Sequence, residues 1–253
     1  MNKSRPPFIN NGNLETYLTG QLFSNYLKFR FVKKTIIPKR VDLIEQLLKD
    51  KVVLHFGCCD HANLIEEKIK TKTHLQIKIS DIAAKCVGVD NNQEALNKLN
   101  SLNIQNCFYY DLYETNDPVI ENDFYDCVLL GEIMEHIADP VAFLRKIHTK
   151  FVNAKEIIIT VPNAFSSRNF YNIKKGIEEI NTDHKYWFTP YTISKVATEA
   201  GFKMESIYFV DRSRLNIPDK IVKWFYLLLN KDPFVSRKWS IIKANGLVII
   251  CKF

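Results

Sequence analysis

Apolar residues in the middle of the chain form short, nearly continuous runs that alternate with segments of helical periodicity. Runs of this kind are typical of strands that are buried on both faces of a parallel sheet. The expected strands cover residues 52–56, 86–89, 107–110, 125–130 and 156–161, with two more near 204–210 and 246–251. The expected helices cover residues 64–69, 75–84, 93–102 and 141–151. This order predicts an α/β fold with a doubly wound sheet.

The segments outside this pattern predict a cap and two insertions. Residues 14–49 show helical periodicity broken at Pro38, which indicates an N-terminal helical cap over 1–50 and a main α/β domain over 51–253. The connection at about 163–190 is too long for a simple loop, and such segments are commonly lids or substrate loops. A second insertion, at about 213–240, carries an amphipathic pattern at 219–229 that we expect to pack on the core.

Composition narrows the class of protein. The six cysteines have no CxxC spacing and no disulfide pattern, and most of them lie inside apolar runs, so a reducing compartment fits. The first residues lack the apolar core of a signal peptide, and the longest apolar run near the C-terminus is far shorter than a membrane span. We therefore expect a cytoplasmic protein with no transmembrane segment. The net charge of +7 is spread along the chain, which argues against a nucleic-acid partner without excluding one.

Candidate ligand-binding residues follow the first three strands. In an open α/β sheet, ligands bind beyond the carboxyl ends of the strands. Gly57 follows the first strand and permits a tight turn, Asp90 follows the second, and Asp111 follows the third. A carboxylate such as Asp90 can accept hydrogen bonds from both hydroxyls of a ribose, and Asp111 can meet the amino group of a purine. The alternative is that both aspartates cap the segments that follow them.

Four segments together resemble the class I S-adenosylmethionine-dependent methyltransferases. They read VLHFGC at 53–58, VGVD at 87–90, YDL at 110–112 and YDCVLLGEIMEH at 125–136, and the resemblance extends from about residue 50 to 210. It implies a Rossmann-like sheet of seven strands, mostly parallel with an antiparallel last strand, and S-adenosylmethionine as cofactor. The cofactor-binding residues that it implies are His55, Gly57, Cys58, Asp90, Asn91, Asp111, Leu112 and Gly131.

The first turn departs from that family at two positions. The family usually has an acidic residue where this chain has His55, and a glycine where it has Cys59. The NAD-type GxGxxG pattern is also absent, which argues against a dinucleotide oxidoreductase. The two departures leave a second reading open, in which the domain is an inert cofactor-binding module.

A cluster of ionisable residues follows the fourth strand. Glu132, Glu135 and His136 are spaced i, i+3 and i+4, so a helix would bring Glu132 opposite the other two. Similar runs occur in ubiquinone-pathway-like O-methyltransferases and in small-RNA 2′-O-methyltransferases, and in the RNA enzymes the run and a later histidine bind a divalent ion. Here the later histidine is His184. Three roles remain open: a site for Mg²⁺, Mn²⁺ or Zn²⁺ at Glu132, Glu135, His136 and His184, metal-free catalysis by His136, His184 and Glu132, or a structural role.

The insertion at 163–190 suggests the class of acceptor. It mixes amides and arginine with aromatic rings, a combination that suits sugars and other polyhydroxyl compounds. Its Pro-Asn turn at 162–163 and the run DHKYWFTPYT at 183–192 resemble methyltransferases of surface-polysaccharide pathways. We therefore expect O-methylation of a sugar, a glycan precursor or a phosphorylated small molecule. The alternative acceptor is an RNA 2′-hydroxyl.

Overall fold

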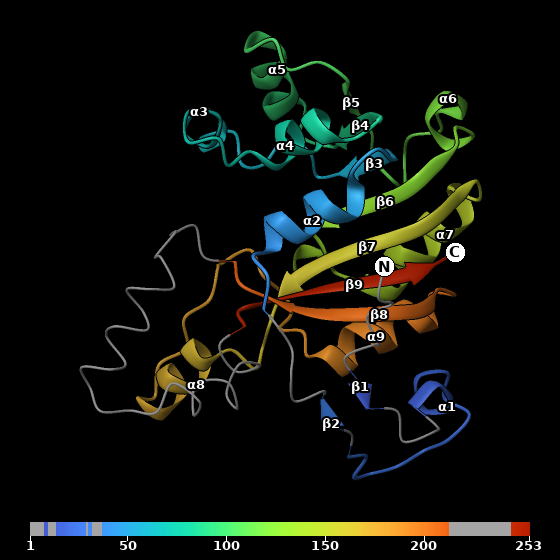
Figure 1. The fold of residues 1–253 in the computed structure, drawn as a ribbon, viewed down its shortest axis with the longest axis vertical. Coiled ribbons are helices and arrows are strands. Elements are labelled where there is room, and N and C mark those ends of the chain that lie inside the picture. Colours follow the sequence, from blue (N-terminus) through green and yellow to red (C-terminus); the bar gives the residue numbers. More distant parts are fainter. Residues whose placement is uncertain (1–7, 10–13, 29, 32–36, 213–243) are drawn as a thin grey trace.

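A seven-stranded sheet forms the centre of the protein (Figure 1). The computed structural model describes residues 8–9, 14–28, 30–31, 37–212 and 244–253. The strands are β3 (Val52–Phe56), β4 (Lys85–Asp90), β5 (Cys107–Tyr109), β6 (Tyr125–Gly131), β7 (Ala154–Pro162), β8 (Lys203–Val210) and β9 (Gly246–Lys252). Their order in the sheet is β5-β4-β3-β6-β7-β9-β8. The last strand, β9, runs antiparallel to both neighbours and the other pairs are parallel, as predicted.

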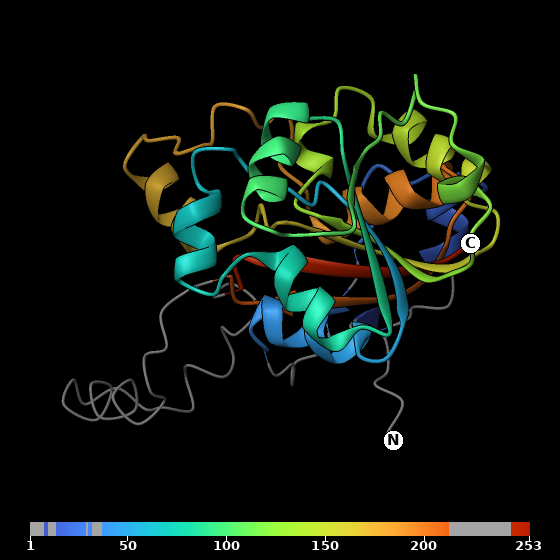
Figure 2. The same ribbon diagram turned by 90° about the horizontal axis from the view of Figure 1, so that it is seen from above.

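Helices cover both faces of the sheet (Figure 2). Successive residues of a strand point to opposite faces, so Leu54 joins one buried cluster and Val53 joins another. Helices α7 (Pro140–Lys150) and α9 (Pro190–Glu199) pack on the first face, and α2 (Arg40–Leu48) and α4 (Leu75–Ile82) on the second. Burial on both sides explains why the strands read as continuous apolar runs.

Smaller helices complete the chain's path. Helix α3 (Ile65–Lys70) and α5 (Gln93–Ser101) share a third buried cluster that includes Cys58 and Cys107. A short helix, α6 (Pro118–Glu121), was not predicted from periodicity, since four residues are too few to show one. Its start was readable, because Asp117 caps its first N–H groups and Pro118 occupies its first position. Across the described residues, no helix is long and apolar enough to cross a membrane.

The expectation of helix throughout residues 14–49 is wrong in its middle part. Helix α1 (Leu14–Leu18) ends just before Gly20, whose φ of 78° is left-handed, and the described residues up to 28 are turns, bends or irregular backbone. Strands β1 (Phe8–Ile9) and β2 (Arg30–Phe31) then pair antiparallel. Helix α2 begins after Pro38, where the break was predicted.

The first insertion contains helix α8 (Ser167–Lys174), which Ser166 caps at its N-terminus. The two ends of the insertion lie side by side. Asn163 and Phe188 form a parallel bridge, and the Ala164 N–H donates to the Phe188 carbonyl over 2.9 Å. The second insertion, at about 213–240, and its predicted helix at 219–229 lie outside the described residues.

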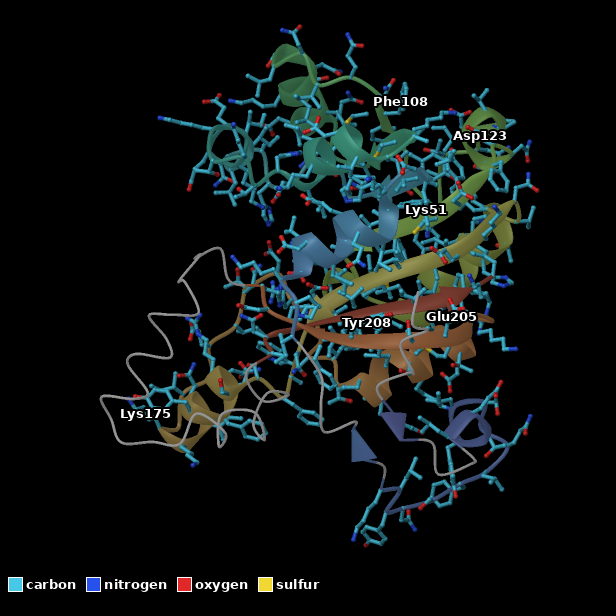
Figure 3. All side chains as sticks on the ribbon, viewed as in Figure 1. Lys51, Phe108, Asp123, Lys175, Glu205 and Tyr208 are labelled. Carbon is cyan, nitrogen blue, oxygen red and sulfur yellow. The ribbon has the colours of Figure 1, made fainter. Side chains whose placement is uncertain are left out.

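Charged groups at the amino ends of the strands are paired. Lys85 and Asp123 approach to 2.6 Å, Lys155 and Asp126 to 2.8 Å, and Lys51 pairs with Glu156. Figure 3 shows Lys51 and Asp123 at this end of the molecule. These ion pairs have a structural role at the amino ends of the strands, and the candidate ligand-binding residues lie at the carboxyl ends.

Candidate active site

The turn after β3 is held against β4. The Gly57 N–H donates to the Val89 carbonyl over 2.9 Å, and the φ of Gly57 is 68°. A Cβ at this position would lie 2.9 Å from Ile133 Cδ1, closer than side chains tolerate. Glycine is therefore required both by the backbone conformation and by the space, as a tight ligand-facing turn needs.

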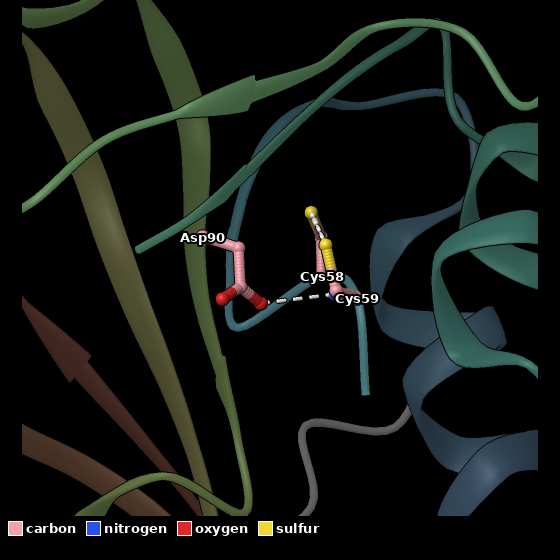
Figure 4. Close-up of side chains that lie close together, drawn as sticks. All are labelled: Cys58, Cys59 and Asp90. Atoms are coloured by element: carbon pink, nitrogen blue, oxygen red, sulfur yellow. Dashed lines mark hydrogen bonds between the residues drawn. The ribbon is translucent and has the colours of Figure 1, made fainter. Parts of the chain in front are cut away.

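Asp90 ties the end of β4 to this turn (Figure 4). Its Oδ2 accepts a hydrogen bond from the Cys59 N–H over 3.1 Å, and its Oδ1 accepts one from the Asn92 N–H over 3.0 Å. The N-cap of α5 is Asn92, which accepts from the Ala95 N–H, so Asp90 is not the helix cap that the alternative reading proposed. A half-buried carboxylate whose two oxygens are fixed in this way keeps lone pairs for further donors such as hydroxyls.

His55 lies beneath α4 rather than in the open turn. Its side chain is buried, and its Nδ1 donates to Gln76 Oε1 over 2.8 Å, while Nε2 has no hydrogen-bond partner. Burial lowers the pKa of His55 to about 4, so the imidazole is neutral at physiological pH. Gly131 lies beside it, since a Cβ there would be 3.4 Å from His55 Nε2. Gln76 was missed from the sequence, because a glutamine on a helix gives no sign of its partner.

In the segment after β5, the Asp111 carboxylate is hydrogen-bonded to backbone groups of the same segment. Asp111 Oδ1 accepts hydrogen bonds from the Tyr113 and Glu114 N–H groups over 2.8 and 3.1 Å, so this aspartate does cap the turn that follows it. Partial burial raises the pKa of Asp111, but these hydrogen bonds outweigh burial and leave the pKa lowered. Asn91 lies next to Asp111 and is exposed, whereas Leu112 is buried in the core.

Glu132 does not sit in a helix, contrary to the expected i, i+3, i+4 arrangement. It has a φ of 62°, and only the 3-10 turn η1 (Met134–His136) follows it. The Glu132 N–H donates to the Thr160 carbonyl, which keeps β6 and β7 paired past Gly131. The Glu132 side chain forms an ion pair with Arg212 at the end of β8. Arg212 was missed, because it follows a strand without any motif.

Glu135 is the most unusual group of the site. It is fully buried, and neither carboxylate oxygen has a hydrogen-bond partner. Burial, and then the charge of Glu132, raise its pKa to about 8. Buried carboxylates are costly unless they are paired or bound to a cation. The Glu135 carboxyl group is therefore expected to bind a cation or to hold a proton.

His136 and His184 lie beside Glu135. Their rings are perpendicular with centroids 4.7 Å apart, and His184 Nδ1 is buried without a partner. Burial is the first cause that lowers the pKa of both rings, so both are neutral bases at neutral pH. One ligand atom from each of Glu135, His136 and His184 lies within 4.8 Å of the other two. The geometry brings these three predicted residues together, and Glu132 stays outside the set.

Hydrogen bonds from the insertion hold His184 in place. The Lys185 N–H donates to the Glu135 carbonyl over 2.7 Å, and the Lys185 ammonium donates to the His136 carbonyl. The Tyr186 hydroxyl donates to the Ala138 carbonyl over 2.8 Å. These bonds connect two segments almost fifty residues apart in the sequence, and they hold the insertion with His184 next to η1.

A cleft opens next to these histidines. Its volume is about 410 Å³, and amides, serines, one aromatic ring and ionisable groups line it. His184, Trp187 and Arg212 line it, and so do Arg168 and Glu179, which form an ion pair with each other. A polar cleft with one large ring beside two neutral imidazoles is suited to a hydroxylated acceptor.

Comparison with known proteins assigns the class. Residues 26–207 match the model of a methyltransferase domain family, and the chain belongs to that family. It is a methyltransferase that uses S-adenosylmethionine as methyl donor, and the inert-module reading is set aside. No curated protein matches the sequence.

Solved structures support the fold. The chain is similar to an S-adenosylmethionine-dependent methyltransferase from Mesorhizobium loti, with 10% identity, a TM-score of 0.51, and coverage of 84% of this chain and 95% of that one. It is also similar to the small RNA methyltransferase HEN1, with 17% identity, a TM-score of 0.50, and coverage of 84% of this chain and 24% of that one. Likeness at such low identity extends to the arrangement of strands and helices alone.

Proposed function

We propose that this methyltransferase methylates a hydroxyl of a sugar, a glycan precursor or a phosphorylated small molecule, with the acceptor oxygen placed at Glu135, His136 and His184. The observation that carries the proposal is the convergence of these three side chains, with unpartnered buried atoms, beside a polar cleft. Such groups at the carboxyl end of a sheet are arranged for chemistry rather than for stability.

The methyl donor would lie across the ends of β3, β4 and β5. In this proposal Gly57 and Cys58 border its methionine part, Asp90 accepts hydrogen bonds from its ribose hydroxyls, and Asp111 with Asn91 lies near its adenine. Asp90 is supported by its position, because both oxygens are already fixed by backbone N–H groups and still have free lone pairs. Two other residues have weaker support, since His55 lies beneath α4 and Leu112 is buried.

The residues present fit a divalent metal ion. Two carboxylate oxygens of Glu135, the Nδ1 atom of His184 and the Oε1 atom of Glu132 are buried and unpartnered, as expected of atoms that await a cation. Glu135, His136 and His184 would hold Mg²⁺, Mn²⁺ or Zn²⁺, with Glu132 close by through its free oxygen. When bound, the ion would lower the pKa of the acceptor hydroxyl and fix its direction.

The chain's own residues align the acceptor and take its proton. In methyl transfer, the acceptor oxygen forms a bond to the methyl carbon, the bond from that carbon to sulfur breaks, and the hydroxyl proton must leave. In the metal-free form of this proposal, His184 and His136 are neutral and can accept that proton, whereas Glu135 is largely protonated near neutral pH because its pKa is raised to about 8. The hydrogen bonds of Lys185 and Tyr186 hold the segment around His184 against Glu135 and Ala138, which restricts where this imidazole can lie.

RNA is the second acceptor class. The likeness to a small RNA methyltransferase favours it. Against it, both arginines that line the cleft are engaged in ion pairs, Arg168 with Glu179 and Arg212 with Glu132. An RNA strand would bring several phosphates to the cleft, and binding them through these arginines would have to break both pairs, so a compact, hydroxylated acceptor is the better match.

Labelled methyl transfer tests the proposal. Purified protein, S-adenosylmethionine with a labelled methyl group, and Mn²⁺ or Mg²⁺ are incubated with nucleotide sugars, phosphorylated metabolites or short RNAs. We expect label on a hydroxyl of a sugar or phosphorylated compound, and loss of that transfer in His184→Ala. Transfer to RNA alone would show that the acceptor is RNA and not a sugar or phosphorylated compound. Full activity of His184→Ala in a chelator would show that Glu135, His136 and His184 take no part in the reaction.

A further inference from the structure

Two adjacent buried thiols occupy the turn after β3. The Sγ atoms of Cys58 and Cys59 are 3.8 Å apart, and both cysteines are free thiols. Figure 4 shows the pair beside Asp90, whose Oδ2 accepts from the Cys59 N–H. One ligand atom from each of these three residues lies within 4.8 Å of the other two. Nothing in the methyl-transfer reaction needs these two thiols.

The sulfur separation matches metal coordination. Zinc binds cysteine sulfur at about 2.3 Å in tetrahedral sites, which places two sulfur ligands roughly 3.8 Å apart. The observed separation of 3.8 Å is therefore already that of two ligands on one ion. Cys107 adds a third thiol within hydrogen-bonding reach of Cys58, so sulfur donors are concentrated at this point.

We propose that Cys58, Cys59 and Asp90 form a binding site for a thiophilic divalent cation, such as Zn²⁺ or Cd²⁺, and that this ion and the methyl donor exclude each other. The exclusion rests on the proposed function, in which Asp90 binds the ribose of the donor. A carboxylate that coordinates a metal ion cannot offer the same lone pairs to two hydroxyls. The ion would thus inhibit the enzyme by occupying the cofactor turn.

Binding changes the protonation of the site. Both thiols lose their protons to solvent as two metal–sulfur bonds form, and one oxygen of Asp90 supplies the third ligand. Water completes the tetrahedron. Because Asp90 is half-buried while both thiols are buried, the ion would enter from the side of Asp90, which is also where a donor nucleoside would lie.

This site differs from the Glu135 cluster in ligand chemistry. Thiolates select soft ions, whereas a carboxylate with two imidazoles also suits Mn²⁺. The ultraviolet absorption of a cadmium–thiolate bond therefore reports on Cys58 and Cys59 and is silent on Glu135, His136 and His184. This difference allows one probe to separate the two sites in the full-length protein.

A cadmium titration tests the site. Full-length protein, kept reduced with a phosphine, is titrated with Cd²⁺ while thiolate absorption is recorded. We expect the thiolate absorption to saturate, and at least a tenfold weaker affinity in the Cys58→Ser and Cys59→Ser variants. Cys251→Ala, which removes a buried thiol of β9, is the matched control and should bind as the wild type does. Absence of the absorption, or its persistence in a Cys58→Ser/Cys59→Ser double variant, would overturn the site.

A second measurement does not depend on the variants. The ¹¹³Cd resonance of the wild-type complex should fall at the shift of an ion with sulfur ligands; a shift typical of oxygen and nitrogen ligands alone would contradict the assignment.

Competition separates this inference from the proposed function. Calorimetry with S-adenosylhomocysteine should give at least a tenfold weaker affinity when the wild type is saturated with Cd²⁺. Unchanged affinity would overturn the exclusion. If Cd²⁺ binds at the thiols but the nucleoside fails to bind the metal-free protein, the proposed cofactor site is wrong and the metal site stands.

Discussion

The two ends of the proposed active site differ in how far their polar groups are satisfied. At the donor end, Asp90 and Asp111 accept hydrogen bonds from backbone N–H groups, and their carboxylates are fixed before any ligand arrives. At the acceptor end, Glu135 and His184 have buried atoms without partners. The donor end is therefore a preformed surface, whereas the acceptor end holds groups that only a ligand, an ion or a proton can satisfy.

This contrast shows where the fold gives up stability. A buried carboxylate without partners costs free energy that a hydrogen-bonded one does not. The cost is borne at Glu135, where the chemistry is proposed to occur, and not in the turns that bind a nucleoside. The predictions below probe that difference, beginning with the largest expected effect.

Replacing the ionisable carboxyl group of Glu135 should slow the reaction strongly without harming the fold. In Glu135→Gln we expect kcat to fall by about 10²- to 10⁴-fold, because the group that aligns the acceptor or holds an ion is lost. The thermal midpoint of the metal-free variant should equal or exceed that of the wild type, since a poorly solvated carboxylate is gone. Glu205→Gln, at an exposed position of β8 (Figure 3), is the matched control. A marked drop in the midpoint with normal kcat would assign Glu135 a structural role.

Neutralising Asp90 should weaken donor binding to a smaller extent. Asp90→Asn removes charge-assisted hydrogen bonds worth about 1.5–3 kcal/mol, so the affinity for S-adenosylhomocysteine should fall roughly 10- to 100-fold. Calorimetry measures this change, and Asp81→Asn, on the exposed side of α4, serves as control. If Asp90→Asn and the wild type bind S-adenosylhomocysteine with equal affinity, the proposed contact between Asp90 and the ribose is wrong.

The two ends should respond to pH in opposite directions. His55 titrates near 4 in the folded protein instead of 6.5, so the unfolded chain takes up a proton that the folded one does not, and the free energy of unfolding falls as pH drops through this range. Glu135 titrates near 8 instead of 4.5, so the folded protein retains a proton that the unfolded chain has lost, and the free energy of unfolding falls as pH rises from 4.5 to 8.

Thermal midpoints measured in a chelator check this opposition. His55→Gln should flatten the acid side of the stability profile, and Glu135→Gln should flatten the alkaline side. Parallel profiles for wild type and both variants would contradict the protonation states assigned to these groups.

A helix cap just before β6 gives the smallest effect. Asp117 accepts hydrogen bonds from the Val119 and Ile120 N–H groups at the start of α6. Asp117→Ala should lower the free energy of unfolding by about 1 kcal/mol and leave kcat unchanged. Denaturant unfolding with a parallel activity assay measures both, and an altered kcat would show that the site depends on this helix.

The sequence predicted most of the fold because the strands are buried on both faces. Continuous apolar runs such as Val52–Phe56 and Tyr125–Gly131 are typical of buried strands. Because ligands bind beyond the carboxyl ends of such strands, the predicted strands also pointed to Asp90 and Glu135 as site residues. The helical periodicity of residues 14–49 was misleading, since Gly20 ends α1 and the next residues form turns.

Details of the site depended on backbone geometry that spacing does not encode. The i, i+3, i+4 pattern suggested a helix, but Glu132 takes a left-handed conformation and turns to Arg212. His55 belongs to the predicted cofactor motif, yet its side chain is hydrogen-bonded to Gln76 of α4. Both outcomes are set by partners more than twenty residues away in the sequence, which a local pattern cannot reveal.

A crystal structure grown with S-adenosylhomocysteine and Mn²⁺ would test the central claim most directly. We predict an anomalous scattering peak between Glu135, His136 and His184, with the ribose hydroxyls of the nucleoside on Asp90. A well-ordered nucleoside at another strand end, or Glu135 without any ion or ligand at saturating Mn²⁺, would contradict it.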